Sequence, residues 1–354
     1  MVALSFWRLT PLLFPDKMVA LSYGEMITIP TLKDVADLAD VAPITVSRVI
    51  NNPESVKEAT REKVKKAMAA VQYIPNVAAK NLATNRSGII DVFVPENIDL
   101  SNPFVMHLIA GISEVLSEHM YSFLILRNRQ KEHLCDGYIV TGLLKNEIRE
   151  FYSYAEERAR PVVLFGHTAL PDVDCIDVDN TLGSRMAVEY LIQKGHRKIA
   201  MINVDENKDY TADRLDGYRS ALREHGLPVD ESSITYAPNN VDGGMRAAET
   251  LLATGGFTAI FCATDTMAIG AAAAVSKAGL KVPEDISLVG FDGLGHQLLA
   301  APILTSVQQP IFEMGRKLAR DLLERLDGRK EKISELISPT LIEGFSVSDI
   351  RSDP

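Results

Sequence analysis

A short segment near the N-terminus carries side chains suited to contact another molecule. Thr45, Ser47 and Arg48 supply two hydroxyls and a guanidinium within four residues. Such groups can hydrogen-bond to base edges and to phosphate oxygens. Val46 and Val49 lie between and beside them, which predicts a helix with one polar and one apolar side.

Three short helices are predicted to position this segment. Leu32, Val35 and Ala39 recur at the spacing of one apolar helix face. The next helix begins at Pro43, since proline suits the first helical position. A third apolar stripe is formed by Val64, Ala67, Met68 and Val71. Two short helices with a tight turn and a supporting third are typical of a helix-turn-helix head, whose second helix enters the major groove. Periodicity alone leaves open a small helical bundle without a DNA contact.

Four spaced blocks of sequence make this interpretation specific. They are TLKDVA at 31–36, TVSRVIN at 45–51, TR at 60–61 and YIPNVAAKNL at 73–82. Their types and order closely resemble the head and hinge of the lactose-repressor (LacI/GalR) family of bacterial transcription regulators.

The resemblance implies DNA contacts position by position. Thr45, Ser47 and Arg48 match recognition-helix residues, and Leu82 matches a leucine that enters the minor groove and opens a base step. Apolar wedges of this kind bend DNA onto more protein surface. The residues expected to bind DNA are Thr31, Pro43, Ile44, Thr45, Ser47, Arg48, Asn51, Tyr73, Asn76, Ala79, Lys80 and Leu82.

Several head residues depart from the family pattern. Asp40 replaces the usual turn glycine, and aspartate tolerates left-handed backbone better than most residues. Ala42 replaces a capping serine, a loss of about 1 kcal/mol, and Lys57 replaces a frequent serine before the third helix. Pro43 and Ile44 occupy the positions that choose bases, and neither side chain can hydrogen-bond. We therefore expect apolar contact with a thymine methyl, and specificity that depends on Arg48 and DNA shape.

The charge is unevenly distributed along the 354 residues. The chain has 37 Lys/Arg and 47 Asp/Glu, a formal net charge of -10. Residues 31–86 hold nine Lys/Arg and six Asp/Glu, and residues 1–30 hold two of each, which leaves 26 and 39 for the remainder. A mildly basic head on an acidic body confines attraction for phosphate to the head.

The remaining composition indicates an ordinary globular protein. The three cysteines lie far apart without metal-ligand spacing, so we expect a reducing cytoplasm, no metal and no cofactor. No stretch is long and apolar enough to cross a membrane. Residues 1–28 are expected to be a disordered extension or the result of a start codon placed too early, because MVALSFW nearly recurs as MVALSYG and Met26 lies close to the head.

Downstream of the head, apolar strands alternate with helices, which predicts parallel sheets covered by helices. The expected elements include strands at 122–126, 162–165 and 259–262 and a helix at 311–326. The expected fold is a small all-α helix-turn-helix head plus an α/β periplasmic-binding-protein-like core of two parallel-sheet subdomains, with a cleft outside the strand C-termini. The expected divisions are a head at 29–74, a hinge helix and linker at 75–87, and an effector-binding and dimerisation core at 88–354. Within the core we expect subdomain 1 at about 88–180 and 308–337, and subdomain 2 at about 181–307 and 338–354.

The resemblance continues through the core and implies an effector site. The residues carried over by position are Ser101, Asn102, Phe104, Arg214, Thr264, Asp265 and Asp292. An arginine fork and a carboxylate are suited to hold the vicinal hydroxyls of a sugar. From the residues alone, Arg214 could be a surface charge, Asp265 could chiefly cap its helix, and His196 is expected to be structural.

One crossover is shorter than the family pattern. Between the strand ending at Leu126 and the Asp136–Gly137 pair, a helix is apparently deleted near 127–136. A parallel crossover needs about ten to twelve residues, so one flank of the first subdomain should be exposed or covered differently.

These observations predict a sequence-specific DNA-binding transcription regulator and not an enzyme. We expect a repressor that binds a pseudo-palindromic operator as a homodimer, without membrane contact, and that responds to a sugar or sugar derivative. The alternative is a sugar-binding or sugar-sensing protein of the periplasmic-binding-protein type without operator control. The basic head and the missing export signal oppose it.

Overall fold

The computed structural model describes residues 30–74, 86–129 and 133–351. The chain divides into two compact units, Met1–Asn76 and Val77–Pro354. In the described residues, no helix has the length and apolar content to cross a membrane. The predicted fold class is confirmed by the elements of both units.

The first unit is a three-helix head. Helix α1 (Leu32–Leu38) is followed by α2 (Pro43–Asn51), a short 3-10 turn η1 (Pro53–Ser55) and α3 (Glu58–Ala70). The three α-helices share one apolar core, which contains Val35, Ala36, Ala39, Val46, Val49, Val64 and Ala67. The predicted spacing of apolar residues therefore places one stripe from each helix at the centre of the head.

The ends of the head helices follow from their capping residues. Thr31 and Asp34 cap α1 reciprocally: the Thr31 backbone N–H donates to Asp34 Oδ2 at 2.7 Å, and the Asp34 N–H donates to Thr31 Oγ1 at 3.4 Å. Asp40 has a φ of 47°, in the left-handed region where the family pattern has a glycine. Ala42 and Lys57 precede α2 and α3 without side-chain capping bonds, as their residue types predict.

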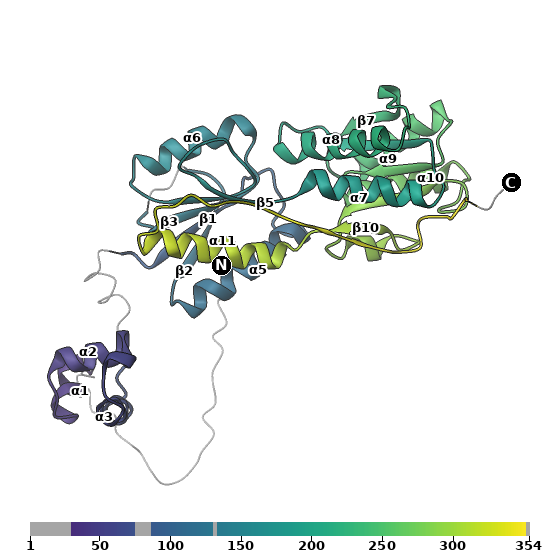
Figure 1. Cartoon of the computed structure of the whole chain (residues 1–354). Helices are drawn as coiled ribbons and strands as arrows, with labels where there is room; N and C mark the ends of the chain where they lie inside the picture. Colours follow the sequence, from purple (N-terminus) through teal and green to yellow (C-terminus); the bar gives the residue numbers. More distant parts are fainter. Residues whose placement is uncertain (1–29, 75–85, 130–132, 352–354) are drawn as a thin grey trace, which may run out of the picture. The chain divides into compact units, whose positions relative to one another are not determined.

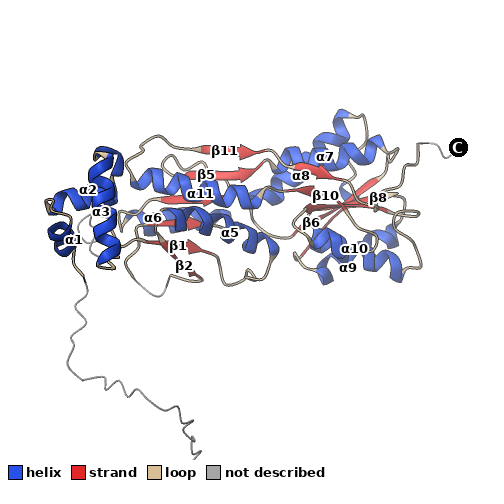
Figure 2. Ribbon diagram, turned by 90° about the horizontal axis from the view of Figure 1, so that it is seen from below, coloured by secondary structure: helices blue, strands red, loops and turns tan. Residues whose placement is uncertain are grey.

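The second unit contains two six-stranded sheets (Figures 1 and 2). The first has the order β11-β5-β4-β3-β1-β2, and all its strands are parallel. Its strands are β1 (Ile89–Phe93), β2 (Ser122–Leu126), β3 (Gly137–Val140), β4 (Val162–Phe165), β5 (Asp174–Val178) and β11 (Ser334–Ile337). Helices α5 (Pro103–Glu118) and α11 (Ile311–Leu326) pack on one face, and α6 (Lys145–Glu156) packs on the other.

The second sheet has the order β12-β10-β9-β8-β6-β7. Its strands are β6 (Ile199–Val204), β7 (Ile234–Ala237), β8 (Ala259–Cys262), β9 (Ser287–Asp292), β10 (Thr305–Gln308) and β12 (Thr340–Ile342). Strand β12 runs antiparallel to β10, which departs from the all-parallel expectation. Helices α7 (Asn180–Gln193) and α8 (Asp209–Glu224) cover one face, and α9 (Val241–Thr254) and α10 (Asp265–Lys277) cover the other (Figure 2).

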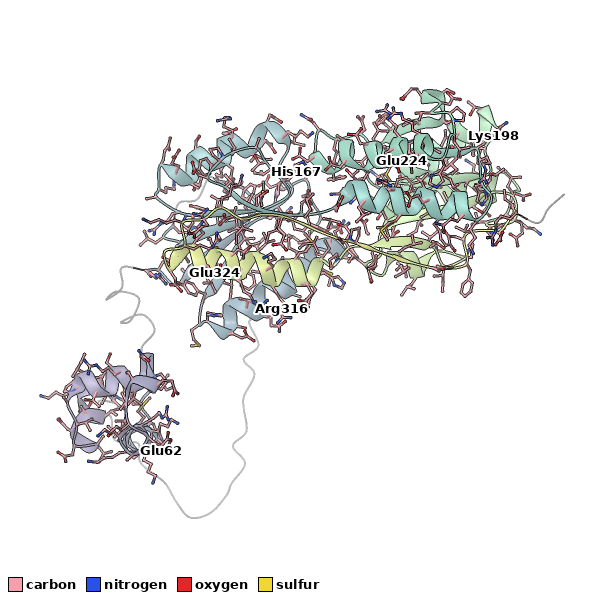
Figure 3. All side chains as sticks on the ribbon, in the orientation of Figure 1. Glu62, His167, Lys198, Glu224, Arg316 and Glu324 are labelled. Carbon is pink, nitrogen blue, oxygen red and sulfur yellow. The ribbon has the colours of Figure 1, made fainter. Side chains whose placement is uncertain are left out.

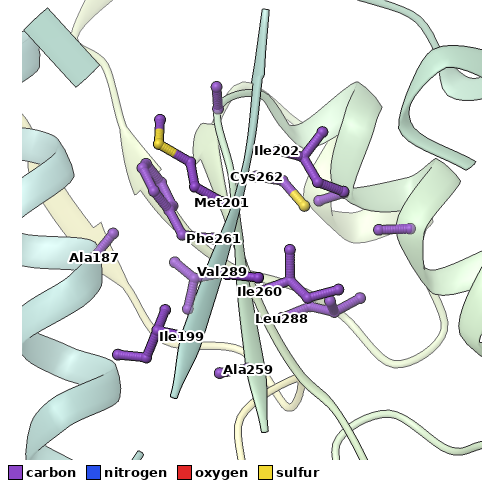
Figure 4. Packing of buried hydrophobic residues seen from close by; sticks show 14 of the residues in the cluster. Ala187, Ile199, Met201, Ile202, Ala259, Ile260, Phe261, Cys262, Leu288 and Val289 are labelled. Carbon is purple, nitrogen blue, oxygen red and sulfur yellow. The ribbon is translucent and has the colours of Figure 1, made fainter. Parts of the chain in front are cut away.

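The second sheet is buried on both sides. Every residue of β6 is buried, and Met201, Phe261 and Val289 form part of one continuous apolar cluster around β6, β8 and β9 (Figure 4). A parallel sheet covered by helices on both faces needs such uninterrupted apolar strands. This cluster is the largest apolar core that the described residues form.

Two glycines bring α5 and α11 into close contact in the first subdomain. A Cβ atom at Gly111 would lie 2.0 Å from the carbonyl oxygen of Phe312, and one at Gly315 would lie 2.4 Å from that of Leu108. Neither distance is possible for real atoms, so only glycine allows the two helix backbones to approach this closely.

The shortened crossover leads from β2 to β3 without a helix in its described residues, 127–129 and 133–136. On the flank that a helix would cover, Leu124 of β2 is 45% exposed. The neighbouring Asp91 is buried in the middle of β1, and His133 Nε2 lies 2.7 Å from Asp91 Oδ1. Arg127 donates to the carbonyl of Ile98 at 2.6 Å. The flank is therefore partly exposed and partly covered by polar contacts, as the short crossover predicts.

Several elements were not predicted from the sequence. Helix α6 has an apolar stripe formed by Ile148, Phe151 and Ala155, which periodicity could have identified. Strand β5 begins and nearly ends with an aspartate, so it lacks a simple strand pattern. Strands β7, β10, β11 and β12 are three or four residues long and each contains at least one polar residue, whereas β4 and β8, which are equally short, are wholly apolar.

Candidate functional site

The exposed surface of α2 is the candidate DNA-contacting surface of the head. Pro43 and Arg48 are exposed, and Ile44 is 59% exposed although it is apolar. Thr45 and Ser47 are half-buried beside them. This arrangement presents one apolar and one cationic side chain on the same short helix, which suits a thymine methyl and a base edge or phosphate respectively.

The other predicted DNA-binding residues lie in several parts of the head or outside the described residues. The Thr31 hydroxyl donates to Asp34 Oδ2 at 2.7 Å and so belongs to the cap of α1. Tyr73 is half-buried and packs against the head core. Asn51 is the last residue of α2. The four remaining predictions, Asn76, Ala79, Lys80 and Leu82, lie outside the described residues.

A cavity of about 300 Å³ lies between the two subdomains of the second unit. Its walls come from the ends of strands in both sheets and from the loops and helices that follow them, which is where open α/β sheets bind ligands. Five of the seven predicted effector residues line it, namely Asn102, Phe104, Arg214, Thr264 and Asp292.

Arg214 is fixed from several directions. It is buried, its guanidinium carbon lies 3.7 Å from the ring centre of Phe291, and its Nε donates to Asn180 Oδ1 at 2.9 Å. Its Nη1 donates to the carbonyl of Ala263 and lies 3.8 Å from Asp292 Oδ1. Burial lowers the pKa of Arg214, and the nearby Asp292 carboxylate opposes this effect. The result is a preoriented guanidinium beside a carboxylate at the cavity wall.

Asp292 is held in an uncommon backbone conformation. Its φ is 124°, in the region that non-glycine residues rarely adopt, and Gln309 Nε2 donates to its Oδ1 at 2.7 Å. Burial raises the pKa of Asp292, whereas Arg214 and Gln309 favour its charged form. Strain of this kind often accompanies residues whose side chains must point at a ligand.

The apolar and neutral parts of the wall are also ordered. Phe104 and Phe165 meet edge to face with ring centres 5.0 Å apart. Asn102 caps α5 by accepting the Phe104 N–H at 2.9 Å. Thr264 caps α10, and its hydroxyl donates to Asn239 Oδ1 at 2.8 Å.

Two predicted effector residues do not line the cavity. Ser101 is exposed, and its hydroxyl donates to Asp99 Oδ2 at 2.8 Å. Asp265 is completely buried behind the wall, where it accepts bonds from Ser306 Oγ at 2.6 Å and from the Gly293 N–H at 2.8 Å. Burial, followed by the nearby Asp292, raises the pKa of Asp265. Its role is to join α10 to β9 and β10, while the adjacent Thr264 is the cap.

The cavity also has polar residues that neither the sequence pattern nor the family resemblance singles out. They are Asn97, Asp99, Asp177, Asn180, Glu206, Lys208, Asp209, Tyr210, Asn239 and Gln309. Gln309 comes directly after β10, and Asn180 lies two residues after the end of the buried strand β5. A polar residue at the carboxyl end of a parallel strand is a general signal for a ligand-facing position, and it could have identified both.

Comparison with known sequences gives two family matches. Residues 31–76 match the model of bacterial regulatory proteins of the lacI family, and residues 188–347 match the periplasmic binding protein-like domain. The HTH-type transcriptional regulator CelR of Thermobifida fusca is 35% identical over 326 residues, which cover 88% of this chain and 96% of that protein.

The chain belongs to the lacI family.

Further relatives support this assignment. The protein is therefore a DNA-binding transcription regulator. The HTH-type transcriptional repressor CytR of Escherichia coli K12 is 35% identical, over 85% of this chain and 91% of CytR. The structure of the transcriptional regulator CelR–cellobiose complex matches with a TM-score of 0.69 and 32% identity, over 90% of this chain and 99% of that one. The lac repressor dimer bound to operator and the anti-inducer ONPF matches with a TM-score of 0.71 and 26% identity, over the same shares.

Proposed function

We propose that this lacI-family regulator is a repressor that binds a pseudo-palindromic operator as a homodimer and is controlled by a neutral, polyhydroxylated effector, namely a sugar or sugar derivative. The lac repressor was solved as a dimer on its operator, and CytR is named a repressor. Two identical heads related by a two-fold axis read two half-sites of opposite direction, which is why a palindrome is expected.

The pairing of Arg214 with Asp292 at the cavity wall carries the effector proposal. A guanidinium held in place by Asn180 and Ala263, 3.8 Å from a carboxylate, offers donors and acceptors to adjacent hydroxyl groups without further rearrangement. Cellobiose is the ligand in the related CelR complex, which supports a sugar here.

The charges around the cavity favour a neutral effector over an anionic one. Two cationic side chains, Lys208 and Arg214, line it. Five carboxylates line it as well, those of Asp99, Asp177, Glu206, Asp209 and Asp292. A phosphate or carboxylate on the ligand would be repelled by this excess of negative charge. A ring with several hydroxyls can instead use the many acceptors, and its apolar face can rest on Phe104.

We propose that the effector acts by changing how the two subdomains are arranged. A ligand that contacts residues of both subdomains favours whichever arrangement brings its contacts together, and this preference is the coupling energy. We propose that this rearrangement is transmitted to the hinge at 75–87, between the head at 29–74 and the core at 88–354. The proposed role of Pro75 to Leu82 is to become helical on operator DNA, with Leu82 in the minor groove.

The protein is proposed to act by binding and not by catalysis, as a regulator in the cytoplasm where its operator lies. The family relatives are named as regulators and repressors, which supports this assignment. No cofactor is required for operator recognition of this type.

The test begins with selection of bound sequences from a random duplex library. An enriched palindrome, with affinity that falls steeply as salt rises, is the expected result. That operator is then used to screen neutral sugars, uronates and sugar phosphates for release. A folded protein that enriches no sequence, with or without the sugar panel, would overturn the operator proposal.

A variant tests the effector site separately. Asp292→Asn should weaken the sugar's effect at least about tenfold, because a charged hydrogen bond is worth about 1.5–3 kcal/mol. Operator affinity without effector should stay unchanged. Asp216→Asn is the matched control, since Asp216 is exposed on α8 outside the cavity. Equal responses of the two variants would contradict the assignment of Asp292.

A further inference from the structure

Three ionisable side chains meet beside the cavity, where the two subdomains face each other. His167 follows β4, Asp177 lies in β5, and Asp213 lies in α8. One donor atom from each lies within 4.8 Å of the others. His167 and Asp177 come from the first subdomain and Asp213 from the second, and Figure 3 shows His167 at the junction of the two.

The distances fit donors that share one ion. His167 Nδ1 lies 3.1 Å from Asp177 Oδ2 and 3.7 Å from Asp213 Oδ2. Metal–nitrogen and metal–oxygen bonds of about 2.0–2.2 Å place neighbouring ligands about 3 to 3.5 Å apart. The same ring nitrogen therefore faces both carboxylates at nearly the spacing that a shared cation requires.

The opposite edge of the imidazole supplies an independent observation. His167 Nε2 faces Asp209 Oδ1 at 3.7 Å. A metal-bound histidine keeps one N–H, which a carboxylate commonly orients. Asp209 is in turn held by Lys145 Nζ at 3.1 Å. The ring is thus placed with one nitrogen toward two carboxylates and the other toward a third that is already fixed.

Asp177 lacks a permanent positive partner. It is 4% exposed, and its Oδ1 accepts the Val178 N–H at 2.8 Å. Among the described residues, His167 is the only group that forms an ion pair with it. Asp209 and Asp213 add two further negative charges nearby. Lys145 pairs with Asp209, and Arg214, which also acts electrostatically on Asp177, is held by Asn180, Ala263 and Asp292. A buried carboxylate without a fixed cation is costly, so the cluster favours an added positive charge.

From these observations we infer that His167, Asp177 and Asp213 form a binding site for a divalent transition-metal cation of the Zn²⁺ class, completed by water, which joins the two subdomains at the edge of the cavity. One imidazole and two carboxylates suit Zn²⁺, Co²⁺ or Mn²⁺ better than a soft cation such as Cu⁺. Because Asp177 also lines the cavity, a bound ion would favour the closed arrangement of the subdomains. Metal binding itself is independent of the proposed function, since it is measured without DNA or sugar.

The experiment uses the full chain, stripped of metal with EDTA, dialysed, and titrated with Co²⁺. The expected result is a saturable visible absorption band at one Co²⁺ per chain, which Zn²⁺ displaces. His167→Gln and Asp213→Asn should each weaken Co²⁺ binding at least about tenfold, the usual range for loss of a ligand or its support. Zn²⁺ should also raise the unfolding temperature of the native chain but not of the variants.

Matched controls separate this site from adventitious surface binding. His107→Gln removes an exposed histidine on α5, and Asp216→Asn removes an exposed carboxylate on the same helix as Asp213. Both should bind Co²⁺ as the native chain does. Circular dichroism of the metal-free variants establishes that they fold. No saturable band in the native chain, or an unchanged band in folded His167→Gln and Asp213→Asn, would overturn the inference.

Discussion

The two sheets of the core are shielded from solvent in different ways. The second sheet is covered by helix pairs on both faces, and β6 is buried throughout. The first sheet ends at β2, where Leu124 is 45% exposed and a polar loop replaces a helix. The buried Asp91 of β1 is paired there with His133 across 2.7 Å. Helices that cover a sheet stabilise it through every apolar residue they bury, whereas a polar loop stabilises it through a few paired groups. Substitutions at the two sheets should therefore lower the free energy of unfolding for different reasons.

The largest effect is expected in the second core. Phe261→Ala removes a side chain that is 0% exposed and should lower the free energy of unfolding by about 3–5 kcal/mol. Leu124→Ala in β2 should cost less than about 1 kcal/mol, because half of that side chain already faces water. Urea unfolding followed by circular dichroism measures both. Similar losses would remove the distinction between the sheets.

The Asp91–His133 pair tests the polar cover directly. His133→Ala leaves a buried carboxylate unpaired and should cost about 1–3 kcal/mol. Adding Asp91→Val should recover most of that loss, because removing both polar partners also removes the unpaired charge. The double-mutant cycle is measured by urea unfolding. A double variant less stable than His133→Ala would show that the pair does not act as proposed.

A smaller effect on stability is expected from pH, and it arises from a histidine in the second subdomain. His196 is buried, its Nδ1 lies 2.8 Å from Thr258 Oγ1, and burial lowers its pKa. The native state therefore takes up this proton at a lower pH than the unfolded chain, whose histidines have the ordinary pKa of about 6.5. Stability should be complete above this pH and decrease as pH falls below it. Folded His196→Gln should show a shallower loss between pH 7 and 5 in thermal unfolding.

The smallest stability effect is expected at the exposed surface of the head. Ile44→Gln should change the free energy of unfolding by less than about 0.5 kcal/mol, because Ile44 is 59% exposed. It should nevertheless change which outer bases are enriched in the operator selection, since glutamine can hydrogen-bond to adenine. An unchanged operator preference would count against base contact by Ile44.

The sequence predicts elements well where apolar pattern and length agree. Strands β2, β4 and β8 and helix α11 begin and end where the pattern predicts. It does not predict β5, because Asp174 looks unsuitable for a buried strand. Arg325 Nε, which donates to Asp174 Oδ2 at 2.7 Å, comes from α11 more than a hundred residues later, and pattern analysis cannot detect such a pairing.

The residues that line the cavity were also predicted in part. Position by position, the family resemblance selects Arg214, Asp292 and three others that line it. It also selects Asp265, whose side chain instead lies behind the cavity wall, against β9 and β10. A Cβ atom at Gly290 would lie 2.2 Å from Asp265 Oδ1, so the carboxylate occupies space that only this glycine leaves open. The direction of a side chain at the first turn of a helix depends on such packing, which linear sequence does not contain.

The glycine contact between α5 and α11 has a mechanical consequence. Because backbone meets backbone at Gly111 and Gly315, no side chain lies between the helices at these two positions that could absorb a displacement by changing rotamer. Helix α11 begins just after the chain returns from β10, and α5 begins at the cavity wall beside Phe104. We therefore expect α5 and α11 to move together as one rigid pair, so that a displacement at the cavity wall is transmitted to the chain crossover before α11.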